Sequence, residues 1–235
     1  MAKGTLFLIP NFIGEENVAQ SFPSENIKVI HQLDFFFVER AKSARSFLSK
    51  VDHPKPINEI ELKELPSPKT KNAVDFNWLS KLIEGKSAGL LSEAGMPAVA
   101  DPGEKLIALA HELELQVKPL IGPSSILLAL AASGLNGEGF SFHGYLPIDK
   151  KERTRKIKFF ENLVRTQNLT QIFMETPYRN NQLLDNLIKS CSPVTKLCIA
   201  ANLNSAKEKV ITRTIGEWKA RKPDLNKQPA IFLIG

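Results

Sequence analysis

The stretch from Lys86 to Gly103, KSAGLLSEAGMPAVADPG, constrains the fold of this chain most strongly. A short apolar run, 88–91, is followed by small residues, by glycine and proline, and then by a helical pattern. This order predicts a buried strand, a loop and a helix, and in α/β folds ligands bind at such loops. Gly95 can adopt backbone angles that other residues avoid and has no side chain to keep a ligand away. Ordinary loops show the same punctuation, so a purely structural role is the alternative.

Strands and helices alternate along the first half of the chain. Helical spacing of apolar residues predicts a helix at 36–51. Apolar runs predict strands at 5–9, 27–30, 88–91 and 116–121. This alternation predicts a parallel sheet with helices on both faces. A second alternating series follows, so we expect an α/β fold with mixed or parallel sheets and two domains, 1–121 and 122–235.

Two predicted helices begin with polar residues. Asp101, Pro102 and Glu104 have the residue types of an N-cap, a first helical position and a third helical position. The segment 122–125, GPSS, opens the other helix, and free amide groups at a helix start attract electron-rich ligand atoms. The two serines add hydroxyl groups, and simple helix capping is their alternative role.

Cations outnumber anions in this chain. There are 31 Lys and Arg residues against 25 Asp and Glu residues, which gives a formal net charge of +6. The excess is concentrated at 150–158, where Lys150, Lys151, Arg153 and Arg155 are candidates for contacting RNA phosphates. A solvated helix face is the alternative interpretation of this cluster.

Several other classes of protein are disfavoured. The four histidines are scattered and no Cys/His spacing fits a metal site, so we expect no metal. Cys191 and Cys198 are expected to be reduced, since the N-terminal stretch lacks the features of a secretory signal. No apolar run approaches the roughly 20 residues that a membrane span needs. We therefore expect a cytoplasmic protein without a membrane partner.

Five motifs occur in order along the chain: SEAGMPAVADPG, PLIGPSS, GYLP, FMETPYR and QPAIFLIG. Together they resemble the motifs of the tetrapyrrole (corrin/porphyrin) methylase family, and most closely its branch that methylates small-subunit ribosomal RNA on cytidine 2'-oxygens. The likeness covers most of 92–179. It implies a methyltransferase dependent on S-adenosylmethionine (SAM), built as two α/β domains with SAM in the cleft between them. It also implies a homodimer, with RNA as the favoured substrate.

The resemblance further implies which positions meet the cofactor. These are Ala94, Gly95, Met96, Val99, Ser124, Ser125, Met174, Glu175, Ala201, Pro229 and Ala230. Small residues at strand ends suit a cofactor recognised by backbone groups and apolar packing. Methyl transfer from a sulfonium mainly requires alignment and exclusion of water, with a general base if the acceptor is a hydroxyl.

Several polar motifs of that branch are altered here. Glu93 stands where the branch has an aspartate, and 201–205 replaces a segment with arginine, glutamate and lysine. The remaining polar candidates for catalysis are Glu39, Glu93, Glu175 and Arg179, with structural ion pairs as their alternative role. The alternative functions are methylation of a tetrapyrrole or another small molecule, and binding of SAM or RNA without turnover.

Overall fold

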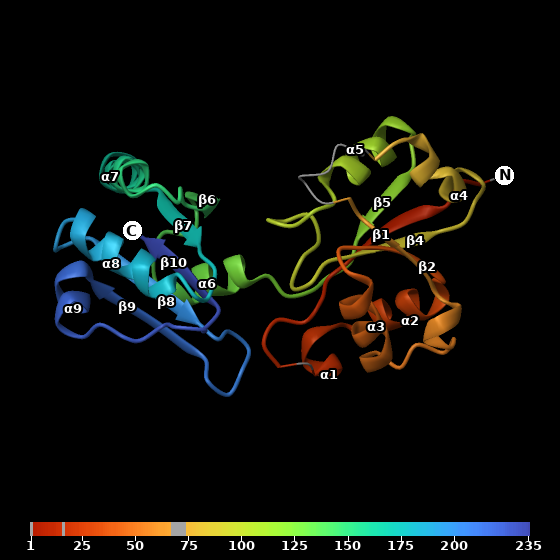
Figure 1. The fold of residues 1–235 in the computed structure, drawn as a ribbon, viewed down its shortest axis with the longest axis horizontal. Helices are drawn as coiled ribbons and strands as arrows, with labels where there is room; N and C mark the ends of the chain where they lie inside the picture. The colour runs from red at the N-terminus through yellow and green to blue at the C-terminus, as the bar shows by residue number, and fades with distance from the viewer. Residues whose placement is uncertain (1, 16, 67–73) are drawn as a thin grey trace. The chain divides into compact units, whose positions relative to one another are not determined.

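The chain forms two compact units, 1–124 and 125–235 (Figure 1). The computed structural model describes residues 2–15, 17–66 and 74–235. Each unit contains one five-stranded sheet and several helices, which confirms the expected α/β class. Every helix among the described residues is too short or too polar to span a bilayer.

The sheet of the first unit is entirely parallel, as the alternation of elements predicts. Its strand order is β3-β2-β4-β1-β5. The strands are β1 (Thr5–Ile9), β2 (Phe35–Val38), β3 (Glu61–Glu64), β4 (Ala88–Leu91) and β5 (Gln116–Pro119). The helices are α1 (Val18–Ser21), α2 (Ser24–Gln32), α3 (Ala41–Lys50), α4 (Ser80–Ile83) and α5 (Glu104–Glu112), with 3-10 turns at Ile57–Glu59 and Phe76–Trp78.

Strand β2 shows why this sheet is covered on both faces. Phe36 and Val38 belong to a core cluster that includes residues of α2 and α3. Phe35 and Phe37 belong to a second cluster, which includes residues of α4 and α5. None of these four side chains is more than 2% exposed. Burial on both faces is typical of a parallel strand between two helical layers.

The structure corrects two predictions in this unit. Residues 27–30 lie in helix α2 instead of a strand, and Phe36–Val38 belong to β2, so the predicted helix begins only at Ala41. In α2, Asn26 and Ile30 are buried while Lys28 is exposed, which is one-sided helical burial. A short apolar run has no period of its own that separates helix from strand, and the tertiary packing decides between them.

The start of α5 also differs from the prediction. Gly103, not Asp101, is the N-cap, and it makes no side-chain cap hydrogen bond. Gly103 has φ +139°, a conformation that L side chains rarely adopt, and a Cβ there would lie 2.9 Å from Cδ2 of Leu90. The close approach of the chain to β4 therefore requires glycine, and the Asp101 carboxylate is available for other interactions.

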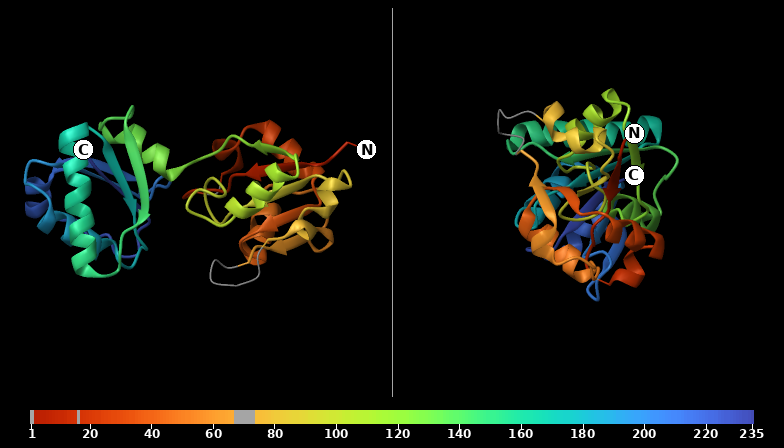
Figure 2. Two further views of the ribbon diagram at one scale, coloured as in Figure 1. Left: turned by 90° about the horizontal axis from the view of Figure 1, so that it is seen from above. Right: turned by 90° about the vertical axis from the view of Figure 1, so that its right-hand side faces the viewer.

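The second unit has a mixed sheet with the order β6-β7-β10-β8-β9. Only β6 and β7 are parallel, since β10 runs antiparallel between β7 and β8, and β8 pairs antiparallel with β9. Its strands are β6 (Phe140–Tyr145), β7 (Thr170–Met174), β8 (Lys196–Ala201), β9 (Lys209–Thr214) and β10 (Ala230–Ile234). Its helices are α6 (Ser125–Ser133), α7 (Lys150–Gln167), α8 (Asn180–Ser190) and α9 (Ile215–Ala220). The long helix α7 lies along one side of this sheet (Figure 2).

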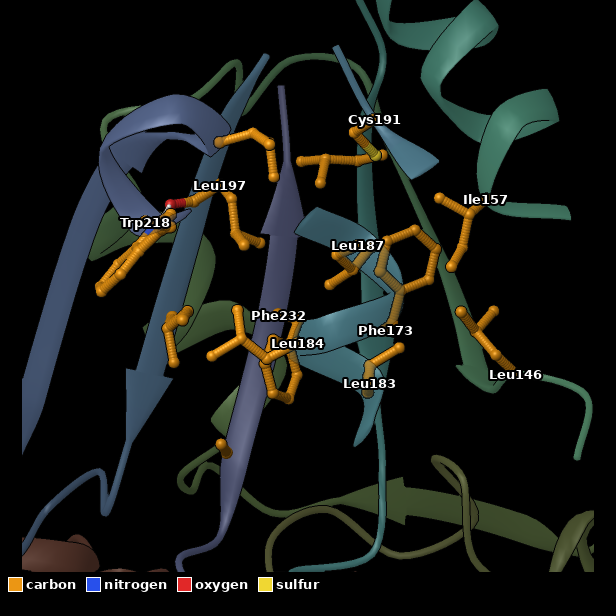
Figure 3. Close-up of a cluster of buried hydrophobic side chains, with 14 of the residues drawn as sticks. Leu146, Ile157, Phe173, Leu183, Leu184, Leu187, Cys191, Leu197, Trp218 and Phe232 are labelled. Atoms are coloured by element: carbon orange, nitrogen blue, oxygen red, sulfur yellow. Dashed lines mark hydrogen bonds between the residues drawn. The ribbon is translucent and has the colours of Figure 1, made fainter. Parts of the chain in front are cut away.

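The core of the second unit lies where α7, α8 and α9 meet the sheet (Figure 3). Phe173 of β7 and Phe232 of β10 are register partners and are fully buried. Trp218 of α9 is buried as well, and its indole Nε1 donates a hydrogen bond of 2.8 Å to the carbonyl of Leu197. Both cysteines are buried and free, which agrees with the expectation that they are reduced.

Candidate active site

Three loops of the first unit meet where strands β1, β4 and β5 end. Asn11, two residues after β1, forms an isolated antiparallel bridge with Gly95, four residues after β4. The Asn11 amide donates to the Gly95 carbonyl at 2.9 Å, and the Gly95 amide donates back at 3.2 Å. The third loop reaches the same place through Pro123. We call this meeting of the segments 11–13, 92–96 and 122–123 the Gly95 junction.

The side chain of Asn11 fixes the junction. It is only 6% exposed, and its Nδ2 donates to the carbonyls of Ser92 at 2.9 Å and Glu93 at 3.1 Å. Its Oδ1 accepts a hydrogen bond of 2.7 Å from the amide of Phe12. All of these partners are backbone groups, so Asn11 substitutes for a missing strand pairing. From the sequence, 10–14 is a loop after the first strand and only a weak candidate for binding phosphate, and Asn11 has no role of its own; the only signal for it is its position directly after the proline that ends β1.

Gly95 lies at the centre of the junction in the left-handed region, with φ +67°. A Cβ on this residue would lie 3.3 Å from Cδ1 of Ile13 and 3.5 Å from the Pro123 carbonyl oxygen. The neighbouring candidates Ala94 and Met96 are exposed and half-buried. The immediate neighbours of Gly95 in the junction are therefore the Ile13 side chain and the Pro123 backbone.

Val99 lies on a strained part of the same loop. Ala98 and Ala100, its two neighbours, both have left-handed backbone angles, with φ +63° and +64°. Non-glycine residues rarely adopt this region, and each instance costs on the order of 1 kcal/mol. The Val99 side chain between them is 47% exposed although it is apolar. Backbone strain of this kind is concentrated at functional loops, which makes this loop a candidate for one.

Three carboxylates gather beside this loop: Glu39 after β2, Glu93 after β4 and Asp101 before α5. Burial, followed by the charges of Glu39 and Glu93, raises the pKa of Asp101 to about 6. Burial and then the Glu93 charge also raise the pKa of Glu39. Carboxylates with raised pKa values can accept and release protons near neutral pH. The sequence assigned Asp101 to a helix cap and so missed its membership of this acidic cluster.

Removing the charge of Asp101 is expected to stabilise the first unit only at neutral and alkaline pH. Its folded-state pKa of about 6 lies above the ordinary 3.8, so the neutral form is favoured by folding. This stabilisation is complete below about pH 4 and is lost as the pH rises through about 6. Asp101→Asn, which stays neutral, should raise the free energy of unfolding by about 1 kcal/mol at about pH 8, after solvent screening. Urea denaturation at about pH 4 and about pH 8 tests this. An equal gain in the free energy of unfolding at about pH 4 would contradict it.

Five candidates from the second half of the chain lie at the ends of three inner strands of the second sheet, β7, β8 and β10. Met174 ends β7 and pairs with Ile231, while Ala201 ends β8 and pairs with Ala230. Because β10 runs between β7 and β8, its beginning lies beside their carboxyl ends. The structure therefore brings Met174, Glu175, Ala201, Pro229 and Ala230 together, and we call them the β10 edge. Asn202, at φ +52°, donates its amide to the Pro229 carbonyl at 2.9 Å and closes this edge.

Glu175 and Arg179 interact with each other and with the loop between them. Oε1 of Glu175 accepts hydrogen bonds from Nη2 of Arg179 at 2.6 Å, Nε of Arg179 at 3.1 Å and the Thr176 amide at 2.7 Å. The Glu175 side chain is 3% exposed. These contacts order the exit from β7 and the start of α8, which is the structural role that the sequence left open for both residues.

Truncating Glu175 is expected to destabilise the second unit. Glu175→Ala leaves the Thr176 amide and the Arg179 guanidinium without their shared acceptor, which should cost about 2 kcal/mol. The control is Glu25→Ala, because the Glu25–Lys28 pair is well exposed and should contribute less than about 0.5 kcal/mol. Chemical denaturation of both variants measures the difference, and similar losses in the two would refute the assigned role of Glu175.

The remaining candidates lie at the starts of α6 and α7. Ser125 is the first residue of α6, and Ser124 precedes it, as the sequence predicts. On α7, Lys150, Lys151 and Arg155 are exposed. Arg153 is different: it is 3% exposed, and its Nη1 donates to the carbonyls of Pro147 and Ile148, both at 3.4 Å. Its prediction as a phosphate contact is therefore wrong, because the helical period turns this cation toward the core.

Within residues 2–15, 17–66 and 74–235, no group of three or more His, Cys, Asp or Glu residues has a geometry that could hold a metal ion.

Comparison with known proteins gives a consistent assignment. A model of the family described as Tetrapyrrole (Corrin/Porphyrin) Methylases matches residues 24–219. A protein of Halalkalibacterium halodurans named ribosomal RNA small subunit methyltransferase I is 30% identical over 186 residues, which are 79% of this chain and 60% of that protein. The Vibrio cholerae protein of the same name is 31% identical over 159 residues, 66% of this chain and 54% of its own.

Solved structures show the same fold. Cobalt precorrin-4 methyltransferase, a cobalamin biosynthetic enzyme, aligns with a TM-score of 0.61 at 15% identity, covering 98% of this chain and 94% of its own. The fold thus defines a two-unit α/β protein with one five-stranded sheet in each unit. This chain belongs to the tetrapyrrole (corrin/porphyrin) methylase family. It spans about 60% of the length of the Halalkalibacterium relative and 54% of the Vibrio relative.

Proposed function

We propose that this protein is a SAM-dependent methyltransferase that acts on RNA. The observation that carries the proposal is the Gly95 junction, where three loops meet around a residue without a side chain at the carboxyl edge of a parallel sheet. Membership of a methylase family supports the reaction class. The two relatives named as ribosomal RNA methyltransferases support RNA as the substrate class.

Two features of the Gly95 junction and its loop support SAM as the ligand. A Cβ at Gly95 would lie 3.3 Å from Cδ1 of Ile13 and 3.5 Å from the Pro123 carbonyl oxygen, so a residue without a side chain lets the three loops approach one another closely. The exposed Val99 offers apolar packing to a ligand. SAM, when bound, supplies a methyl group activated by a sulfonium. The residues that we propose to hold it are Ala94, Gly95, Met96, Val99, Ser124, Ser125, Met174, Glu175, Ala201, Pro229 and Ala230.

The acidic cluster is the proposed source of a general base. Methylation of a ribose 2'-hydroxyl would form an O–CH3 bond, break the S–CH3 bond of the donor to leave a neutral thioether, and release the hydroxyl proton, which a carboxylate can accept. Asp101, with a pKa of about 6, is mostly ionised at neutral pH and still basic enough to take a proton. Glu39 and Glu93 are the other candidates, whereas Glu175 and Arg179 are occupied by their structural contacts.

Exposed cations on α7 support a nucleic-acid substrate. Lys150, Lys151 and Arg155 present three positive charges within six residues of one helix. Such clusters contact phosphates without reading sequence, and their contribution falls steeply with salt. Arg153 is not part of this set, because it is buried.

Transfer of a labelled methyl group tests the proposal. Purified protein and labelled SAM are incubated with small-subunit ribosomal RNA from cells that lack the gene, with Gly95→Arg as the inactive control. Label in a 2'-O-methylated nucleoside is the expected result. Label in a tetrapyrrole, with none in RNA, would instead assign the small-molecule alternative. Tight SAM binding without transfer to either would assign a non-catalytic role.

The proposal includes a homodimer, which the family resemblance implies. It also places the protein in the cytoplasm, where a ribosomal RNA substrate is found. Light scattering on the purified protein tests the dimer, and a monomeric mass at concentrations that support methyl transfer would refute it.

A further inference from the structure

A pocket of about 420 Å³ opens in the first unit between helix α3 and the loop that follows β1. Helix α3 contributes Lys42, Ser43, Ser46 and Lys50 to its lining. Positions 42, 46 and 50 are spaced by four residues and therefore share one face of the helix. Glu93 of the acidic cluster lies in the lining as well. The functional assignments above use Glu93 of this lining but give no role to the lysines and serines.

The chemistry of the lining fits an anion. Two ammonium groups and two hydroxyl groups come from the same helix face. Helix α3 has no acidic residue in its own first turn, although Glu64 of β3 accepts the Ala41 amide hydrogen at 2.7 Å. The Glu64 carboxylate thus offsets the positive end of the α3 dipole, and the positive charge of the lining comes from the two lysines. Of the described lining residues, Glu93 alone is negative, and Nε of Arg40 lies 3.9 Å from its Oε2.

The wall behind these polar groups is rigid. Phe12 and Phe47 both line the pocket and are at most 6% exposed. With Phe22 they form a cluster of rings whose centroids lie 5.0 to 6.0 Å apart. Because the rings already pack against one another, the pocket can receive a ligand without collapsing or repacking its core.

The pocket adjoins the Gly95 junction. Asn11 lines the pocket and also forms the two backbone hydrogen bonds with Gly95. Glu93 likewise belongs both to the pocket and to the loop segment of the junction. A ligand group in the pocket therefore lies beside the loop that is proposed to hold the methyl donor, and both belong to the first unit.

We propose that this pocket binds a backbone phosphate of the RNA substrate and so positions the strand beside the Gly95 junction. The inference rests on the proposed function and deepens it. Lysine and serine side chains are common phosphate contacts, and such contacts fix the register of a strand without reading its bases. The lysines bind the phosphodiester charge, the serine hydroxyls donate to its oxygens, and the Phe12 wall limits how deeply it enters.

Two pairs of variants test the proposal by fluorescence anisotropy with a short labelled single-stranded RNA. Ser46→Glu places a negative charge in the pocket, and Ser46→Gln is its neutral match of the same size. Lys42→Ala/Lys50→Ala removes two charges, and Lys105→Ala/Lys118→Ala removes two exposed charges from α5 and β5. We expect Ser46→Glu to weaken RNA binding about tenfold and Ser46→Gln less than about threefold. The pocket double variant should also lower the salt dependence by about one phosphate contact, unlike its control.

Equal losses of RNA affinity within either pair would overturn the proposal. In the Ser46 pair they would reflect side-chain size, and in the lysine pair they would reflect net charge. Cytidine monophosphate that binds the native protein more tightly than the RNA does, and loses its affinity in Ser46→Glu, would also overturn it in favour of a free nucleotide. SAM affinity, measured by calorimetry on the same variants, should stay within about twofold of native. RNA binding that depends on the pocket, without any methyl transfer, would contradict the proposed function alone. Methyl transfer with no loss of RNA affinity in Ser46→Glu would contradict the role of the pocket alone.

Discussion

Gly95→Arg is expected to abolish SAM binding, lowering the affinity by more than about 100-fold. Gly95 has φ +67°, so any L side chain there is strained by on the order of 1 kcal/mol. A Cβ would also press on Ile13 at 3.3 Å, and the remainder of the arginine must displace neighbouring segments of the junction. Isothermal titration calorimetry with SAM measures the loss. Unchanged affinity would show that the cofactor binds elsewhere.

A second glycine provides the matched control for this substitution. Gly134, after α6, has φ +68°, and nothing lies within 4 Å of a Cβ built on it. Gly134→Arg therefore introduces the same residue and the same backbone strain in open space. It should destabilise the second unit slightly and leave SAM affinity within about twofold of native. Loss of SAM binding in both variants would mean that the effect of Gly95→Arg is not local.

Phe232→Ala is expected to be the most destabilising single change considered, with a loss of about 4 kcal/mol in the free energy of unfolding of the second unit. Phe232 is 0% exposed on β10 and is the register partner of Phe173 on one side and Ile199 on the other (Figure 3). Truncation leaves a cavity that strands paired on both sides cannot close. Urea denaturation measures the loss.

The control for this prediction is Ile148→Ala in the same unit. Ile148 is 77% exposed, so its truncation removes apolar surface that folding hardly buries. Its expected effect on the free energy of unfolding is less than about 0.5 kcal/mol. A comparable loss of unfolding free energy in both variants would mean that the packing around Phe232 does not govern the stability of this unit.

The candidate site was only partly predictable, and the limits have physical causes. Loops rich in glycine and proline are visible in the sequence, so 92–103 and 122–125 could be singled out directly. Asn11 could not, because its role depends on backbone carbonyls of Ser92 and Glu93, about 80 residues away in the chain. The sequence predicted only a helix cap for Asp101. Its place in the acidic cluster could not be predicted, because its raised pKa depends on burial and on carboxylates that follow two other strands.

The basic segment shows the same limit in a single helix. The sequence gives the number of cations at 150–158, but the rotation of α7 decides which of them face solvent. Arg153 lies on the same side as Ile157 and Phe160, which are buried in the core, so it is buried with them. Lys151 and Arg155 lie on the opposite side and stay exposed.

The sequence by itself determined the α/β class, the parallel first sheet, the position of the loops rich in glycine and proline, and the family resemblance. These follow from local patterns, because alternation, periodicity and turn residues act over a few positions. Only the tertiary structure decided that 27–30 is helical, that FFFV is a strand buried on both faces, and that Asn11, Gly95 and Pro123 meet. Those outcomes depend on contacts between distant segments, whose energies no local pattern contains.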